Sequence, residues 1–193
     1  MNEITMVRNA LLMSLNQTVV DNPFKTTWNM TTGNFTLSSQ TGTYNCTIYW
    51  GDGTAPTQHT TGNPTHTYSS AGQYQISISG SYSGTRMDSD VTNRTKLISV
   101  DNWGNVGFTS FNSAFNSCSN LSKLPNGSIT GANNVTSFEL VFANCTSLTS
   151  IPIGLFDNCS NLTSFYTCFV GCSSLTSIPI GLFDNFSNVT SFY

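Results

Sequence analysis

The side chains with the greatest chemical potential in this chain are two histidines and six cysteines. Histidine can act as a base or a metal ligand, and a cysteine thiolate can act as a nucleophile or bind zinc. A structural zinc site needs closely paired ligands, but the chain has no Cys-x-x-Cys pair. His59 and His66 also lie far from the cysteine-rich second half. These spacings do not predict a zinc site.

No catalytic group is predicted either. Cys168 has no histidine within its own stretch of sequence, which weakens a cysteine-nucleophile hypothesis. Asp157 and Asp184 occupy equivalent positions of a repeat, which is typical of structural corner residues and not of an acid/base pair. We therefore interpret the chain as a non-enzymatic protein without a catalytic residue, cofactor or metal.

The second half of the chain is periodic, with a step of 27 residues. Residues 134–160 and 161–187 are near copies of each other. A period of this length indicates stacked supersecondary units, each burying its apolar residues against the next. We expect a short strand in each half-unit. The predicted ladders are Phe111, Phe138, Phe165 and Phe192; Cys118, Cys145 and Cys172; and Leu121, Leu148 and Leu175.

The cysteine ladder bears on redox chemistry. Three cysteines at one repeat position predict a column of small buried side chains, because free cysteine packs as a small hydrophobe. Buried thiols are the favoured interpretation. The alternative is some disulfide bridging, for which Cys159, Cys168 and Cys172 lie closest together in the sequence.

The first half has a different pattern. Between residues 22 and 80, apolar and polar residues alternate, as in Tyr74, Ile76 and Ile78. This alternation is typical of strands with one buried face. Several short strands separated by turns predict a small antiparallel β-sandwich.

Two segments in this half resemble a known domain family. The segments WGDGT and HTYSSAGQYQISISG resemble the PKD family of immunoglobulin-like domains over residues 22–82. The resemblance implies mainly structural roles for the motif residues. Asp52 could instead help to hold calcium, but a single carboxylate in a turn is a weak site. The motif residues are Trp50, Gly51, Asp52, Gly53, His66, Tyr68, Gly72 and Tyr74.

The repeats resemble a second group. The phrase NWGNVGFTSFNSAFNSCSNL and the repeat body resemble BspA-type leucine-rich-repeat surface proteins, which often carry a PKD-like domain in front. The predicted fold class is therefore mainly β, with a PKD-like sandwich followed by a leucine-rich-repeat-like solenoid. The predicted boundaries are a segment at 1–21, the sandwich at 22–82, a connector at 83–104, and a solenoid at 105–193 that ends in mid-repeat.

The remaining features concern location and partners. Only 8% of residues are charged and the net charge is −3, which disfavours nucleic acid as a partner. No segment is long enough to span a membrane. The first 20 residues do not resemble a secretory signal. Residues 3–17 predict a short helix that packs on the sandwich or docks to a partner or to another copy of the chain; the alternative is a disordered segment. We expect the last repeat turn to contact protein, either a continuation of the natural chain or another subunit, because an uncapped repeat end exposes apolar side chains.

Three functions are compatible with these patterns. The resemblance implies a cell-surface adhesion protein that binds a host protein or glycan through the solenoid, with residues 19–80 as spacer or receptor. The lack of a recognisable secretory signal favours a bacteriophage virion protein that docks through its N-terminal segment. The third hypothesis is a structural protein that self-assembles through the open repeat end or the N-terminal helix. We expect an extracellular or virion-surface location in each case.

Overall fold

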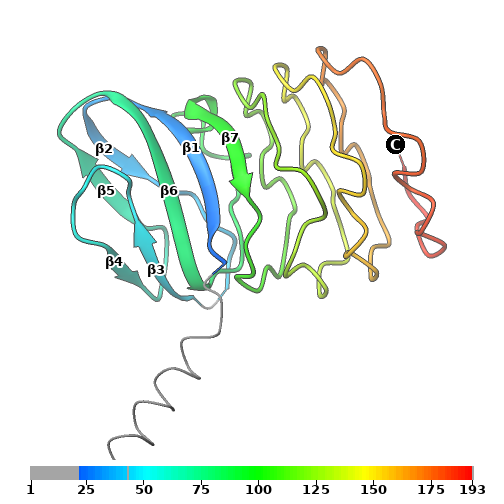
Figure 1. The fold of residues 1–193 in the computed structure, drawn as a ribbon, viewed down its shortest axis with the longest axis horizontal. Helices are drawn as coiled ribbons and strands as arrows, with labels where there is room; N and C mark the ends of the chain where they lie inside the picture. Colours follow the sequence, from blue (N-terminus) through cyan, green and yellow to red (C-terminus); the bar gives the residue numbers. More distant parts are fainter. Residues whose placement is uncertain (1–21, 43, 193) are drawn as a thin grey trace, which may run out of the picture.

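The computed structural model describes residues 22–42 and 44–192 (Figure 1). The protein is mainly β, as the sequence predicts, and within these residues its helical structure is a single 3-10 turn, η1 (Arg94–Lys96). The helix predicted at residues 3–17 lies outside the described residues.

Strands form two antiparallel sheets in the first half of the described chain. A five-stranded sheet has the order β4-β3-β6-β1-β7, and a two-stranded sheet pairs β2 with β5. The strands are β1 (Phe24–Met30), β2 (Gly33–Thr36), β3 (Asn45–Tyr49), β4 (Thr57–His59), β5 (Thr65–Tyr68), β6 (Gly72–Ser81) and β7 (Leu97–Asn102). We call residues 22–102 the two-sheet region.

Alternation of side chains explains the core of this region. In β1, Phe24 and Trp28 point inward and are fully buried, and Ile76 is buried in the neighbouring β6. The rings of Trp28 in β1 and Phe35 in β2 lie 5.1 Å apart, so they join the two sheets. The predicted period of two therefore corresponds to strands that bury one face.

Strand β7 lies within residues 83–104, the segment that we predicted to be a connector. It pairs with β1 as an edge strand of the larger sheet, with Leu97 and Val100 buried. Its other edge meets the first repeat: the Val100 N–H donates to the Lys123 carbonyl at 3.1 Å, and the Ser122 N–H donates to the Ile98 carbonyl at 2.9 Å. One strand is thus shared by the two-sheet region and the repeats.

From residue 105 onward, successive coils of chain lie side by side (Figure 1). We call residues 105–192 the repeat region. Backbone hydrogen bonds join each coil to the next, from the N–H of Phe115 to the carbonyl of Val141 and from that of Phe142 to Cys168, both at 2.9 Å. The coils therefore bond to each other in one register.

The prediction of a short strand in each half-unit is wrong for the described repeats. The coils are joined by isolated parallel bridges at Ser137, Ser164 and Ser191. The backbone turns too often for longer strands, because left-handed residues recur at the repeat period. Their φ angles are positive at Ser113, Leu140 and Thr167; at Ser117, Asn144 and Gly171; and at Gly127, Gly154 and Gly181.

Most residues of the predicted ladders lie inside the coils, but Leu175 is only partly buried and Phe192 is exposed. The rings of Phe138 and Phe165 are stacked at 6.0 Å, and those of Phe165 and Phe192 at 5.7 Å. Leu121 and Leu148 are fully buried. All six cysteines are free and buried, in agreement with the thiol interpretation. The apolar core runs without interruption from Phe24 to Leu182.

Candidate interaction surface

The residues that we predicted to form a PKD-like motif lie close together around the Gly51–Gly53 turn. His66 Nε2 lies 2.7 Å from Asp52 Oδ2, and the Thr54 hydroxyl donates to Asp52 Oδ1 at 2.6 Å. The His66 ring stacks on Trp50 with centroids 4.9 Å apart. Burial acts to raise the pKa of Asp52, but the hydrogen bonds from His66 and Thr54 outweigh it and lower the pKa to about 2.

The same cluster fixes the turn to the strands beneath it. The Tyr68 hydroxyl donates to the Trp50 carbonyl at 3.0 Å, and the Tyr68 ring stacks on Tyr74. At Gly51 (φ +85°), an added Cβ would lie 2.5 Å from the Gln75 carbonyl oxygen, so only glycine fits. Both carboxylate oxygens of Asp52 are engaged by side chains, which favours the structural role over a calcium site.

The cysteine ladder uses its thiols as internal donors. The Cys145 thiol donates to the Phe115 carbonyl at 3.2 Å, and the Cys172 thiol donates to the Phe142 carbonyl at 3.0 Å. Burial raises the pKa of both thiols, and that of Cys159 to about 12. A thiolate is therefore disfavoured, and these groups suit packing better than nucleophilic chemistry. Across the described residues, no group of three or more potential metal ligands occurs.

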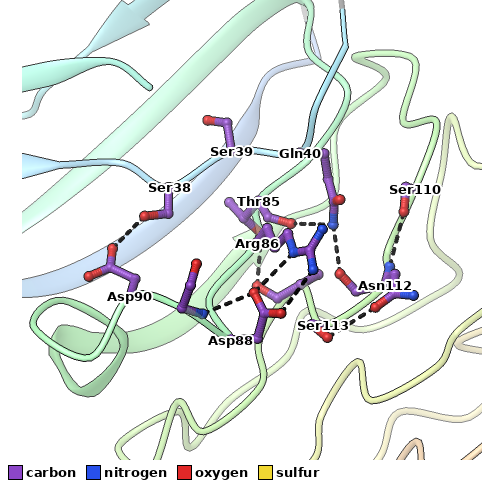
Figure 2. A network of polar contacts seen from close by, with 12 residues as sticks. Ser38, Ser39, Gln40, Thr85, Arg86, Asp88, Asp90, Ser110, Asn112 and Ser113 are labelled. Carbon is purple, nitrogen blue, oxygen red and sulfur yellow. Dashed lines mark hydrogen bonds and ion pairs between the residues drawn. The ribbon is translucent and has the colours of Figure 1, made fainter. Parts of the chain in front are cut away.

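The two-sheet region covers the first coil through a polar network (Figure 2). The buried Gln40 side-chain amide donates to the carbonyls of Thr85 at 2.9 Å and Asn112 at 2.7 Å. The buried Thr85 hydroxyl donates to the Ala114 carbonyl at 3.1 Å. The Met87 N–H donates to the Ser113 carbonyl at 3.1 Å.

The side chains of Gln40 and Thr85 take the place of a preceding coil. One unit later, the carbonyls equivalent to those of Asn112 and Ala114 belong to Glu139 and Val141, and they accept backbone N–H groups from the coil before. In the first coil, Gln40 and Thr85 supply the missing donors. The sequence analysis did not find these two residues, because they lie outside the repeats and no pattern marks them.

Exposed large apolar side chains are concentrated in the later part of the repeat region. Among the described residues, eight large apolar side chains are exposed, and six of them lie between residues 153 and 192. Ile180 is 99% exposed and Ile153 is 75% exposed. We call this surface the distal face; its exposed members are Ile153, Tyr166, Val170, Ile178, Ile180 and Phe192.

A cavity of about 340 Å³ opens on the distal face. The Phe169 ring forms part of its lining and is the last ring of a column with Phe115 and Phe142, whose centroids are 5.5 Å apart at each step. Phe115 and Phe142 are fully buried, whereas Phe169 is only partly buried. The full lining is Phe165, Cys168, Phe169, Val170, Ile178, Phe183 and Phe192.

The backbone at this cavity presents donors. The N–H groups of Phe142 and Asn144 donate to the next coil, but within residues 22–42 and 44–192 their equivalents, Phe169 and Gly171, have no acceptor. The carbonyls of Phe169 and Gly171 already accept N–H groups from Cys172 and Ser173 in tight turns.

The described part of the chain contains no helix that is long and apolar enough to cross a membrane. Comparison of the chain with protein-family models, with curated proteins and with solved structures found no match.

Proposed function

We propose that this chain is a non-enzymatic binding protein displayed on a cell surface. A PKD-like β-sandwich holds a leucine-rich-repeat-like solenoid, and the distal face of the solenoid is the interaction surface. The partner is a protein or glycan on a host cell.

One observation supports the proposal: among the described residues, six of the eight exposed large apolar side chains lie in the repeat region, and two of them, Ile153 and Ile180, occupy equivalent positions of successive units. Soluble proteins seldom expose contiguous apolar surface unless it contacts another molecule, because burial of such surface releases about 25 cal/mol per Å². The open cavity adds a concave element of the kind that binding sites use.

The two-sheet region has a supporting role in this proposal. The sequence left open whether this region is a spacer or a receptor. Its polar atoms at the PKD-like motif bond to one another, and its strand β7 bonds to the first coil. These contacts favour a structural base that carries the solenoid.

Adhesion of coated beads tests the proposal. Beads carrying the full chain should adhere to cultured epithelial cells, and the double variant Val170→Ser, Ile180→Ser should reduce the number of bound beads at least fivefold. Val91→Ser is the matched control, because Val91 is 68% exposed but lies in the two-sheet region. Circular dichroism verifies that each variant is folded. If the beads do not adhere, or the control and the double variant adhere equally, the proposal is wrong.

A further inference from the structure

The two-sheet region has a cavity of its own, of about 370 Å³. It lies between the loop that follows β2 and the loop that joins β4 to β5. Its described lining carries hydroxyl and amide groups and one aromatic ring, with no charged side chain. A volume of this size is typical of small-ligand sites. The uncharged lining disfavours a phosphate or a metal ion as the ligand.

Hydrogen bonds fix the two amide side chains of the lining. Both N–H groups of the Gln40 amide donate to backbone carbonyls, at 2.9 and 2.7 Å, which leaves its Oε1 to accept. Asn63 Oδ1 accepts the Ser39 N–H at 3.0 Å, which leaves Asn63 Nδ2 to donate. The exposed Thr41 adds a hydroxyl that can do both. The lining therefore offers a donor, an acceptor and a hydroxyl.

Tyr44 gives the lining an apolar element. Its ring is 7% exposed and packs against the rings of His59 at 5.2 Å and Tyr82 at 5.8 Å. Tyr82 is itself fully buried, and its hydroxyl lies 3.0 Å from the hydroxyl of Ser39. These contacts hold the Tyr44 ring in place, so it forms a firm apolar surface beside the polar groups.

A buried hydroxyl without a partner lies next to the lining. Gly42 is a lining residue, and an added Cβ there would lie 2.9 Å from Ser83 Oγ. Ser83 is 3% exposed, and its Oγ has no hydrogen-bond partner among the described residues. Buried polar atoms are almost always paired. An unpaired hydroxyl at this position therefore favours a polar occupant of the cavity.

We propose that this cavity binds the pyranose ring of a neutral sugar at the end of a glycan chain. Each sugar hydroxyl both donates and accepts, so adjacent hydroxyls can accept from Asn63 Nδ2 and donate to Gln40 Oε1. The C–H face of the ring would contact Tyr44. Thr41, Gly62 and Asn63 are exposed, so the rest of the glycan can extend into solvent. This site shares no residue with the distal face, and it gives the two-sheet region a receptor function beyond its structural one.

Amide NMR of the full chain tests the site with four probes: the methyl glycosides of glucose, galactose and mannose, and N-acetylglucosamine. At least one should bind one to one with a dissociation constant on the order of 1 mM, because a ligand of roughly a dozen non-hydrogen atoms makes few contacts. The amide signals of Thr41, Gly62 and Asn63 should shift most. Inorganic phosphate should leave these signals unchanged.

Two glycines provide matched variants. Gly62 and Gly53 both have positive φ angles, of +70° and +81°, and no atom lies within 4 Å of an added Cβ at either position. Asparagine tolerates this backbone conformation better than other residues with a side chain. Gly62→Asn places a side chain at the cavity and should weaken sugar binding at least tenfold. Gly53→Asn carries the same backbone strain away from the lining and should bind normally.

An isosteric change tests the hydrogen bonds. Thr41→Val keeps the shape of the side chain, removes its hydroxyl, and should weaken sugar binding at least threefold. Failure of all four probes to bind, or equal binding by the Gly62→Asn and Gly53→Asn variants, would overturn the inference. So would phosphate binding at the same amides, which would identify an anion site instead. The distal-face variant Val170→Ser, Ile180→Ser should keep its sugar binding, and loss of that binding would also contradict a separate site.

Discussion

The first and last coils of the repeat region differ in what packs against them. At the first coil, Gln40 and Thr85 bond to the carbonyls that a preceding coil would have used, and the core continues into the sheets. At the last coil, the donors of Phe169 and Gly171 remain open beside an apolar cavity. The first coil is thus covered by side-chain donors and fully buried rings, whereas Phe169 in the last described coil is only partly buried. The difference comes from what packs against a coil and not from the coil itself.

The largest expected effect comes from removing a ring at the closed end. Phe115→Ala should cost about 3–5 kcal/mol, since it opens a cavity in a fully buried column. The equivalent change at the open end, Phe169→Ala, should cost about 1–2 kcal/mol because that ring is already partly exposed. Urea unfolding of both variants measures the difference. Equal costs would mean that the two ends are equally well packed.

The next largest effect is expected from removing Gln40, which together with Thr85 caps the first coil. Gln40→Ala leaves the Asn112 and Thr85 carbonyls without that donor, and it should destabilise the protein by about 1–3 kcal/mol. Hydrogen exchange should accelerate at the amides of Phe115 and Ser117 more than in the last coil. Thr85→Ser keeps a hydroxyl and serves as the control, with exchange close to that of the unmodified chain. Uniform acceleration along the repeats would contradict the role of a local cap.

Acid should lower the stability of the two-sheet region more than that of the repeat region. The pKa of Asp52 is lowered from 3.8 to about 2 in the folded protein, so its contribution to stability is present above pH 4 and is lost as the pH falls toward 2. Tryptophan fluorescence should therefore report weakening of the two-sheet region in this window. Asp52→Asn removes this carboxylate and should make the loss of stability between pH 4 and pH 2 smaller. An unchanged acid profile in that variant would show that the His66 contact contributes little.

The smallest expected effect on stability lies on the distal face. Ile180→Ser should change the free energy of unfolding by less than about 0.5 kcal/mol, since the side chain is 99% exposed. The same change should lower the binding of a hydrophobic dye such as bis-ANS. Ile151→Ser changes a buried isoleucine of the unit before, with 5% exposure, and should destabilise the protein by more than about 1 kcal/mol. Equal stability of both variants would contradict the exposure difference.

The sequence predicted the mainly β class and the ladder positions, because near-identical units make the buried residues visible as a period. It predicted strands in the coils wrongly, since left-handed backbone at Ser113, Leu140 and Thr167 leaves no mark in residue type. The sequence also did not predict the cap formed by Gln40 and Thr85. Gln40 and Thr85 act through contacts with residues far along the chain, and a single sequence does not show such pairings.

The placement of β7 has a mechanical consequence. Because one of its edges bonds to β1 and the other to the first coil, the sheets and the repeats are joined by backbone hydrogen bonds along a shared strand. The long axis of the coils therefore has one orientation relative to the five-stranded sheet (Figure 1). A molecule bound at the distal face would have a fixed distance and angle relative to the five-stranded sheet. Less orientational freedom would then be lost when both ends of the protein are engaged at once.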